Sequence, residues 1–111
     1  QIVAVGDKRN FISAIIAPNF DALKGYLREK GFDGLSASEM SSHPETISLF
    51  NEEITARMES FPQYEKIKKF IVIDRLFELE KNEITPSLKI RRKAISENFK
   101  DLIDAMYESN S

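Results

Sequence analysis

Three short runs of β-branched and apolar residues constrain the fold of this chain more than any other feature. Two of them, residues 2–5 and 11–17, flank a turn-rich pentapeptide in which Gly6 and Asn10 can adopt a positive φ angle. The third lies within residues 66–74 and contains the continuous apolar stretch 70–73. Runs of this length are typical of strands and are short for helices. We therefore expect a β-hairpin and, much later in the chain, a third strand.

The segments between and after these runs have the apolar spacing of amphipathic helices. Asn19 can cap a helix that Gly31 ends, and further helices are predicted from about Pro44 to Phe61 and from Lys89 to about Tyr107. The intervening segment 31–42, with its two Gly and four Ser, predicts a loop, as does the polar segment 80–86. The expected apolar stripes are Ile47, Phe50, Ile54, Met58 and Phe61 in the middle helix, and Ile95, Phe99, Leu102, Ile103 and Met106 in the last.

The resulting order, ββααβα, predicts an α+β fold in which a small three-stranded sheet, a hairpin plus one later strand, is covered by about three helices. The chain has 111 residues, which suits a single domain. Its first strand begins at Ile2, and residue 1 is Gln rather than Met. We expect either a part of a longer protein or a short protein that has lost its initiator Met.

The composition excludes several kinds of site. The chain has no Cys and one His, His43, so it can form neither a disulfide, nor a thiolate or His-based metal cluster, nor a cysteine nucleophile. Its net charge of -2 argues against a nucleic-acid partner. No apolar run approaches the length of about 18 residues that a transmembrane helix needs. We expect a reducing, cytoplasmic setting without a transmembrane segment.

Two other polar features are interpreted as structural. His43 precedes Pro44 at a predicted helix start, where a polar cap or an exposed side chain is expected rather than a catalytic base. Glu52 and Glu53 are adjacent in the same helix, so their side chains point about 100° apart and are expected to lie on a solvated face.

The chemistry centres on a cluster of cations. Four of the five residues from Lys89 to Lys93 are Lys or Arg, and they fall at the predicted start of the last helix. Cations are unfavourable there because the helix dipole is already positive at that end. Local rules are broken mainly where function requires it, and such a helix start could meet a phosphate. A solvated basic face is the alternative.

The residues around this cluster resemble a known signature. Glu83-Ile84-Thr85-Pro86-Ser87-Leu88-Lys89-Ile90-Arg91-Arg92 is similar to the final signature of the adenylate-forming ligases, in the form E-L-T-P-T-L-K-x-x-R typical of long-chain fatty acyl-CoA synthetases. Residues 3–18 and 100–107 resemble the hairpin and the C-terminal end of that subfamily. Many relatives carry Ser-Gly directly before the lysine, whereas this chain has Ser87-Leu88, which fits the long-chain subfamily.

The resemblance implies a role in a larger enzyme. Residues 1–111 would be the mobile C-terminal domain of a ligase whose large N-terminal domain and hinge are absent here. Such ligases activate a fatty acid with ATP to an acyl-adenylate and then transfer the acyl group to coenzyme A. Lys89 would be the catalytic lysine of adenylate formation, after which the domain rotates. ATP and Mg²⁺ would be bound mainly by the large domain, and this domain alone would be inactive.

Other cations receive weaker assignments. Lys8 and Arg9, at the predicted hairpin tip, are candidates for binding a coenzyme A phosphate. The cations at residues 91–93 are candidates for setting the closed orientation of the two domains. The full-length enzyme could associate peripherally with a membrane, as the resemblance suggests. The alternative function is a free-standing α+β interaction module that docks an acidic partner through its basic helix start.

Overall fold

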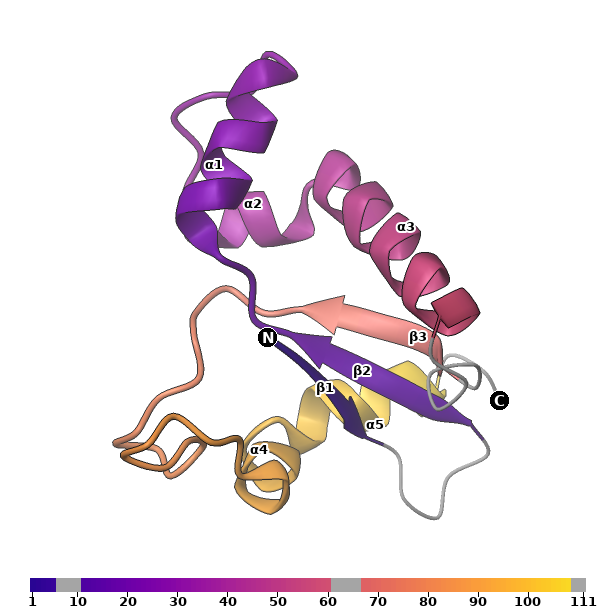
Figure 1. Cartoon of the computed structure of the whole chain (residues 1–111), viewed down its shortest axis with the longest axis vertical. Coiled ribbons are helices and arrows are strands. Elements are labelled where there is room, and N and C mark those ends of the chain that lie inside the picture. The colour runs from indigo at the N-terminus through magenta and orange to yellow at the C-terminus, as the bar shows by residue number, and fades with distance from the viewer. Residues whose placement is uncertain (6–10, 61–66, 109–111) are drawn as a thin grey trace.

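A computed structural model describes residues 1–5, 11–60 and 67–108 of the chain. The described elements, in chain order, are β1 (Ile2–Val5), β2 (Ile12–Ile16), α1 (Phe20–Glu29), α2 (Ala37–Ser42), α3 (Pro44–Ser60), β3 (Ile67–Val72), α4 (Arg92–Asn98) and α5 (Lys100–Glu108). The α+β class with a three-stranded sheet is confirmed (Figure 1). The order is ββαααβαα rather than ββααβα, because one short helix was not predicted and the last helix is divided in two.

The sheet has the order β1-β2-β3 and mixes two kinds of pairing. β1 runs antiparallel to β2, with Val3 opposite Ile15, which confirms the hairpin. The turn predicted at residues 6–10 lies outside the described residues. β3 runs parallel to β2, with Ile15 opposite Ile71. A parallel pair needs a long crossover, and α1, α2 and α3 supply it.

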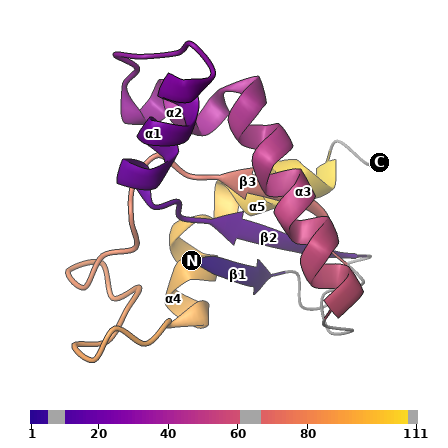
Figure 2. The same cartoon turned by 45° about the horizontal axis from the view of Figure 1, so that its top comes forward.

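Helices lie on both faces of the sheet, as Figures 1 and 2 show: α3 crosses one face, and α4 and α5 lie against the other. The side chains of β2 alternate between the two sides, as the period of a strand requires. Ile15 packs in one core cluster and Ile16 in the other. The first cluster contains Val3, Val5, Ile15, Ala17, Ile73, Phe77, Ile95, Phe99, Ile103 and Met106. The second contains Ala14, Ile16, Ile54, Ile67 and Val72, with Phe50 and Met58 packed against it.

Helix α1 begins where the sequence predicts, because Asn19 Oδ1 accepts a hydrogen bond of 3.1 Å from the backbone N–H of Ala22. The predicted loop at residues 31–42 is wrong over its second half, where α2 forms. Ser36 and Glu39 make a capping box in which Ser36 Oγ accepts from Glu39 N at 3.1 Å and Glu39 Oε1 accepts from Ser36 N at 2.9 Å. Met40 of α2 is buried against α1. The Ser content therefore marks a helix start here rather than a loop alone.

The last helix differs from its prediction at both its start and its middle. It begins at Arg92 rather than Lys89, and Phe99, with φ -108° and ψ 22°, separates α4 from α5. The apolar spacing survives the break, since Ile95, Phe99 and Ile103 are buried together. Leu102 is 40% exposed, so its assignment to the core is wrong.

The stripe of α3 is confirmed for its three central members, Phe50, Ile54 and Met58, which pack on the sheet. Ile47 is 40% exposed, so its predicted place on the core face is wrong. Phe61 lies outside the described residues. No helix in the described part of the chain is both long enough and apolar enough to cross a membrane.

Candidate functional site

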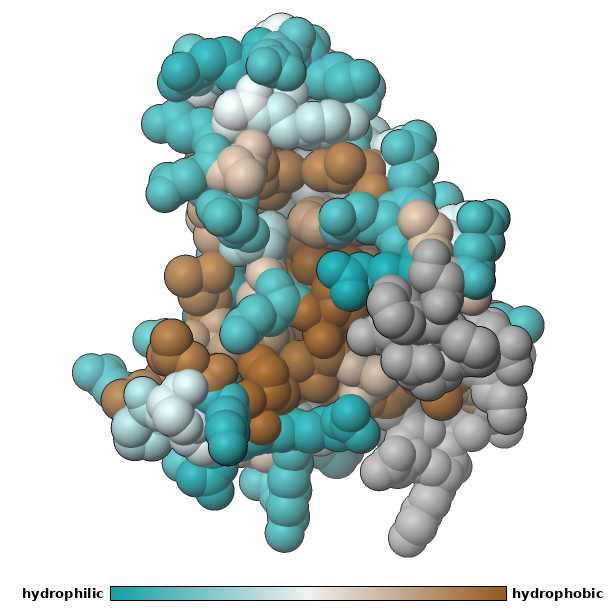
Figure 3. Space-filling view, in the orientation of Figure 1, coloured by the Kyte–Doolittle hydropathy of each residue, from teal (hydrophilic) through white to brown (hydrophobic). Residues whose placement is uncertain are grey.

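The segment that links β3 to α4, residues 73–91, extends away from the sheet and carries most of the signature residues (Figure 1, orange). Within it, Ile84 and Ile90 form an isolated antiparallel bridge. The residues from 84 to 90 are called the lysine loop below. Figure 3 shows hydrophobic surface in the region of this linking segment, and its Leu76, Leu79 and Leu88 side chains are more than half exposed.

Thr85 organises the lysine loop through both its backbone and its side chain. Its C=O accepts from Leu88 N at 2.8 Å, and its N–H donates to Lys89 O at 2.8 Å. Its Oγ1 accepts from Lys89 N at 3.0 Å and lies 3.1 Å from Ser87 Oγ, within hydrogen-bond distance. Pro86 occupies the second position of the turn that the first bond closes, a position that proline favours. The Thr-Pro pair of the signature thus has a clear structural role.

Leu88 adopts a backbone conformation that few non-glycine residues take. Its φ is 64°, in the left-handed region, and its side chain is 69% exposed. This conformation costs a residue with a Cβ about 1 kcal/mol or more. Many of the adenylate-forming ligases that the signature resembles carry Gly directly before their lysine. The left-handed conformation of Leu88 gives a physical reason for this preference, because Gly adopts that conformation without a steric cost.

Lys89 is exposed, and no ion pair joins its ammonium group to any residue within the described ranges. The predicted helix start at Lys89 is wrong, because the backbone of this residue is used inside the loop. Both its N–H and its C=O bond to Thr85, and the N–H of Arg91 donates to Glu83 O at 2.8 Å. The helix can begin only after these bonds, so Lys89 lies three residues before α4 rather than in its first turn.

Glu83 lies directly before the lysine loop and is fully buried. Its carboxylate accepts four hydrogen bonds: 2.7 Å from Arg75 Nη1, 2.8 Å from Arg75 Nη2, 2.9 Å from Glu78 N and 3.0 Å from Asn98 Nδ2. The Arg75 guanidinium also lies 4.8 Å from the centre of the Phe99 ring. The hydrogen bonds from Arg75, above all, lower the pKa of Glu83 to about 2, although burial acts in the opposite direction. Glu83, Arg75 and Asn98 together are called the Glu83 anchor.

The sequence interpretation missed the Glu83 anchor. The segment 80–86 is polar and was expected to be a loop, and nothing in its pattern marks one of its carboxylates as buried. Arg75 and Asn98 lie 8 and 15 residues from Glu83 in the chain, so only the fold brings them together. The one available signal was the place of Glu83 as the first residue of the signature.

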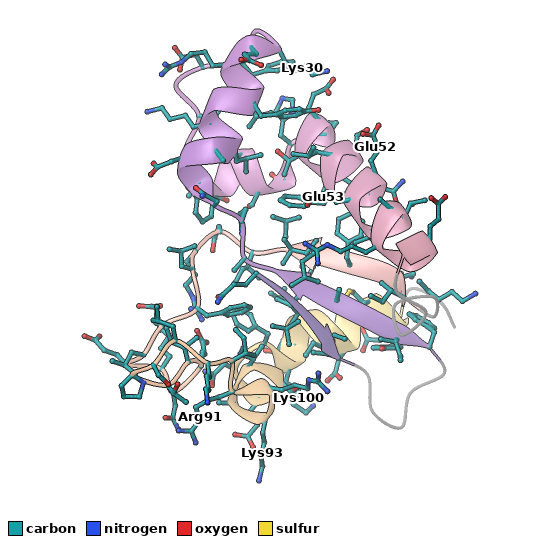
Figure 4. All side chains as sticks on the ribbon, viewed as in Figure 1. Lys30, Glu52, Glu53, Arg91, Lys93 and Lys100 are labelled. Atoms are coloured by element: carbon teal, nitrogen blue, oxygen red, sulfur yellow. The ribbon has the colours of Figure 1, made fainter. Side chains whose placement is uncertain are left out.

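The remaining sequence-predicted cations are not gathered with Lys89 into a single helix start. Arg91, Arg92 and Lys93 are exposed. Arg91 is at the N-cap position of α4, without a side-chain capping hydrogen bond, and the other two are in the first turn of the helix. Figure 4 shows Arg91 and Lys93 on the side of the sheet away from α3. Lys8 and Arg9 lie outside the described residues.

The other polar residues singled out in the sequence are structural. His43 Nδ1 accepts a hydrogen bond of 3.1 Å from Glu45 N at the start of α3, so its interpretation as a cap is confirmed. Glu52 and Glu53 are exposed on α3 (Figure 4), as expected for a solvated face. Within the part of the chain that the structure describes, no three His, Asp or Glu side chains are grouped so that they could hold a metal ion.

Comparisons with known proteins agree with the signature. The family described as AMP-binding enzyme C-terminal domain matches residues 1–111. A long-chain-fatty-acid–CoA ligase of Mycobacterium tuberculosis, FadD15, is 30% identical over 96% of this chain and 18% of its own length. Fatty acyl-CoA synthetase A of Dictyostelium discoideum is 26% identical over 96% and 17%. Human long-chain-fatty-acid–CoA ligase 1 is 23% identical over 89% and 14%.

The chain thus spans less than a fifth of the length of these curated relatives. No solved structure gave a significant match. The family match covers the whole chain, and these three relatives are named as long-chain-fatty-acid–CoA ligases or as a fatty acyl-CoA synthetase. The chain therefore belongs to the family of AMP-binding enzyme C-terminal domains and is homologous to fatty acyl-CoA ligases.

Proposed function

We propose that this chain is the C-terminal domain of a long-chain fatty acyl-CoA ligase and that Lys89 is its adenylation lysine. The observation that supports this most is the placement of Lys89, which is exposed on a closed, hydrogen-bonded loop and has no ion-pair partner among the described residues. A lysine held in this way can be delivered to a site built by another domain. The names of the relatives point to a long-chain fatty acid as the substrate.

The proposed chemistry explains why a lysine is required. In the first half-reaction a fatty-acid carboxylate attacks the α-phosphate of ATP and displaces pyrophosphate, which leaves the acyl-adenylate. Two anions must approach each other, so an ammonium near the carboxylate and the bridging phosphate oxygen offsets their repulsion and stabilises the charge that develops in the transition state. Lysine suits this task because its charge is compact and its stem is flexible. Binding of ATP and Mg²⁺ is assigned mainly to the large domain.

The second half-reaction requires that Lys89 be withdrawn. We assign this step to a rotation of the domain, after which the thiol of coenzyme A attacks the adenylate and releases AMP. The lysine loop is bonded to the turn after β3 and to α4 through the Glu83 anchor, so Lys89 would move with the domain as a unit. Lys8 and Arg9 remain proposed contacts of a coenzyme A phosphate. A cytoplasmic location, with peripheral membrane association of the full-length enzyme, completes the proposal.

The proposal is tested with the full-length protein that carries this domain. Incubation with ATP, Mg²⁺ and a long-chain fatty acid should release pyrophosphate and form the acyl-adenylate, and added coenzyme A should convert it to the thioester with release of AMP. The same protein without residues 1–111 should form the adenylate poorly. Formation of ADP instead of AMP, or undiminished adenylate formation without the domain, would refute the assignment.

A further inference from the structure

Glu83 is the only charged side chain that is buried within the described ranges. Its carboxylate connects two parts of the fold that are distant from each other in the chain. Arg75 and Glu78 come from the turn that follows β3, whereas Asn98 is the last residue of α4. Asn98 Nδ2 also donates to Lys81 O at 3.0 Å, so the same amide holds the preceding turn.

The backbone of Glu83 belongs to the same arrangement. Its N–H donates to Glu78 O at 3.1 Å, and its C=O accepts from Arg91 N at 2.8 Å. The next residues inward, Ile84 and Ile90, form the bridge that closes the lysine loop. Both ends of the loop are therefore bonded at Glu83 or next to it. The direction in which the Lys89 side chain projects from the domain thus depends on the position of Glu83.

The chemistry of the Glu83 anchor suits it to fixing the geometry of the lysine loop more than to adding stability to the fold. A buried ion pair often contributes no more to stability than apolar side chains of the same volume would, because both charges lose their hydration. What the pair does supply is direction, since a guanidinium and a carboxylate joined by two parallel hydrogen bonds have a fixed relative orientation. Phe99 supports the guanidinium of Arg75 from the core side, with the ring 4.8 Å away.

We propose that Glu83 is a positioning residue for adenylate formation: through Arg75 and Asn98 it fixes the lysine loop against the turn after β3 and against α4, and so aims the Lys89 ammonium. This inference rests on the proposed function of Lys89. It assigns Glu83 no contact with the substrate, because its carboxylate is buried and its hydrogen bonds are made within the domain. A displacement of the ammonium by about 1 Å can cost about a hundredfold in rate, so a defective anchor should affect the reaction of Lys89 strongly.

The test uses variants of the anchor in the full-length ligase and measures the two half-reactions separately. Glu83→Gln keeps the size of the side chain but removes its charge and one acceptor. Asn98→Ala removes the amide that donates to Glu83 and to Lys81 O, and it leaves the pair between Arg75 and Glu83 intact. Glu83→Gln should lower the rate of adenylate formation about a hundredfold and Asn98→Ala about tenfold. Thioester formation from a supplied acyl-adenylate should stay within about twofold for both, because it does not use Lys89.

A matched control removes a carboxylate elsewhere. Asp33 is exposed and pairs with Arg28 at 3.4 Å in the turn after α1, so Asp33→Asn should leave both half-reactions unchanged. Lys89→Ala is measured in the same series. If Lys89→Ala spares adenylate formation, the proposed function fails and the positioning role fails with it. If Lys89→Ala abolishes adenylate formation while the anchor variants retain it, only the positioning role is overturned.

Hydrogen exchange in the full-length ligase supplies a readout independent of activity. In Glu83→Gln the exchange of the Lys89 and Arg91 amides should rise at least about tenfold more than that of the Ile15 and Ile71 amides in the paired strands, which report the loss of global stability. Unchanged exchange at Lys89 and Arg91 would overturn the inference, as would equal losses in both half-reactions, which indicate damage to the whole domain. If Glu83→Gln does not fold, Asn98→Ala decides by the same criteria.

Discussion

Arg75 and Glu83 are joined by two parallel hydrogen bonds of 2.7 and 2.8 Å, which connect the turn after strand β3 to the residue that precedes the lysine loop. The pair spans eight residues of irregular chain and closes them into a compact turn. An exposed loop would otherwise sample many directions at little cost. Because of this pair, the loop that carries Lys89, the residue proposed to do chemistry, is tied to the turn after β3, although Lys89 lies outside any helix or strand.

The Arg75–Glu83 pair should make stability depend on pH in the acid range. The folded-state pKa of Glu83 is about 2, below the 4.5 of an ordinary Glu, so its contribution is complete above about pH 5 and is lost as the pH falls through 2. The shift corresponds to at most about 3 kcal/mol. Urea unfolding of the wild type and Glu83→Gln should differ by about this amount at pH 7 and by under about 1 kcal/mol near pH 2. An equal difference at both pH values would contradict the assignment.

The capping box of α2 predicts a modest loss of stability in Ser36→Ala. This change removes the acceptor of the Glu39 N–H and leaves that donor without its partner. The free energy of unfolding should fall by about 1 kcal/mol. Ser38→Ala is the matched control, since Ser38 is exposed in the first turn of the same helix and its side chain makes no hydrogen bond among the described residues. Thermal unfolding that ranks the two variants in the opposite order would show that the box contributes little.

The positive φ of Leu88 predicts an unusual order of stability among variants at this position. Leu88→Asn should raise the free energy of unfolding by up to about 1 kcal/mol, because Asn tolerates the left-handed region better than Leu does. Leu88→Val should lower it by about 1 kcal/mol, because a β-branched side chain tolerates that region worst. The side chain is 69% exposed, so loss of burial has little effect on either value. Chemical denaturation in which Val proves the more stable variant would mean that Leu88 is not left-handed.

The core between the sheet and α4 depends on Ile95, which is completely buried beside Ile15 and Phe99. Ile95→Ala should lower the free energy of unfolding by about 3 kcal/mol through lost burial and a residual cavity. Leu102→Ala removes an apolar side chain of the same size that is 40% exposed, and it should cost under about 1 kcal/mol. Similar losses for both variants, measured by urea unfolding, would place Leu102 in the core instead.

The sequence predicted those parts of the fold in which local pattern and tertiary packing agree. The strand containing Ile15, the cap at Asn19 and the apolar face around Ile54 were all readable, because each follows the period or the capping chemistry of its element. The short helix α2 was not, since its Ser residues favour both loops and helix starts and only the burial of Met40 against α1 decides between them.

The identity of the proposed catalytic residue was predictable from the sequence, but the backbone conformation of the site was not. Lys89 was selected through its signature, yet its expected helical conformation was wrong, because Thr85 and Glu83 take the backbone bonds that a helix would need. The Glu83 anchor could not be foreseen from spacing. Its burial depends on Arg75 and Asn98, which approach Glu83 only once β3 and α4 are packed.

The most direct test of the central proposal compares Lys89→Ala with Lys81→Ala in the full-length ligase. Both variants remove one exposed lysine from the segment that links β3 to α4, but only Lys89 lies in the lysine loop. Single-turnover kinetics should show adenylate formation slowed by about a hundredfold or more in Lys89→Ala, with thioester formation from a supplied acyl-adenylate within about twofold of the wild type. Lys81→Ala should retain both rates. Equal loss of both half-reactions in Lys89→Ala, or equal loss in the two variants, would contradict the role proposed for Lys89.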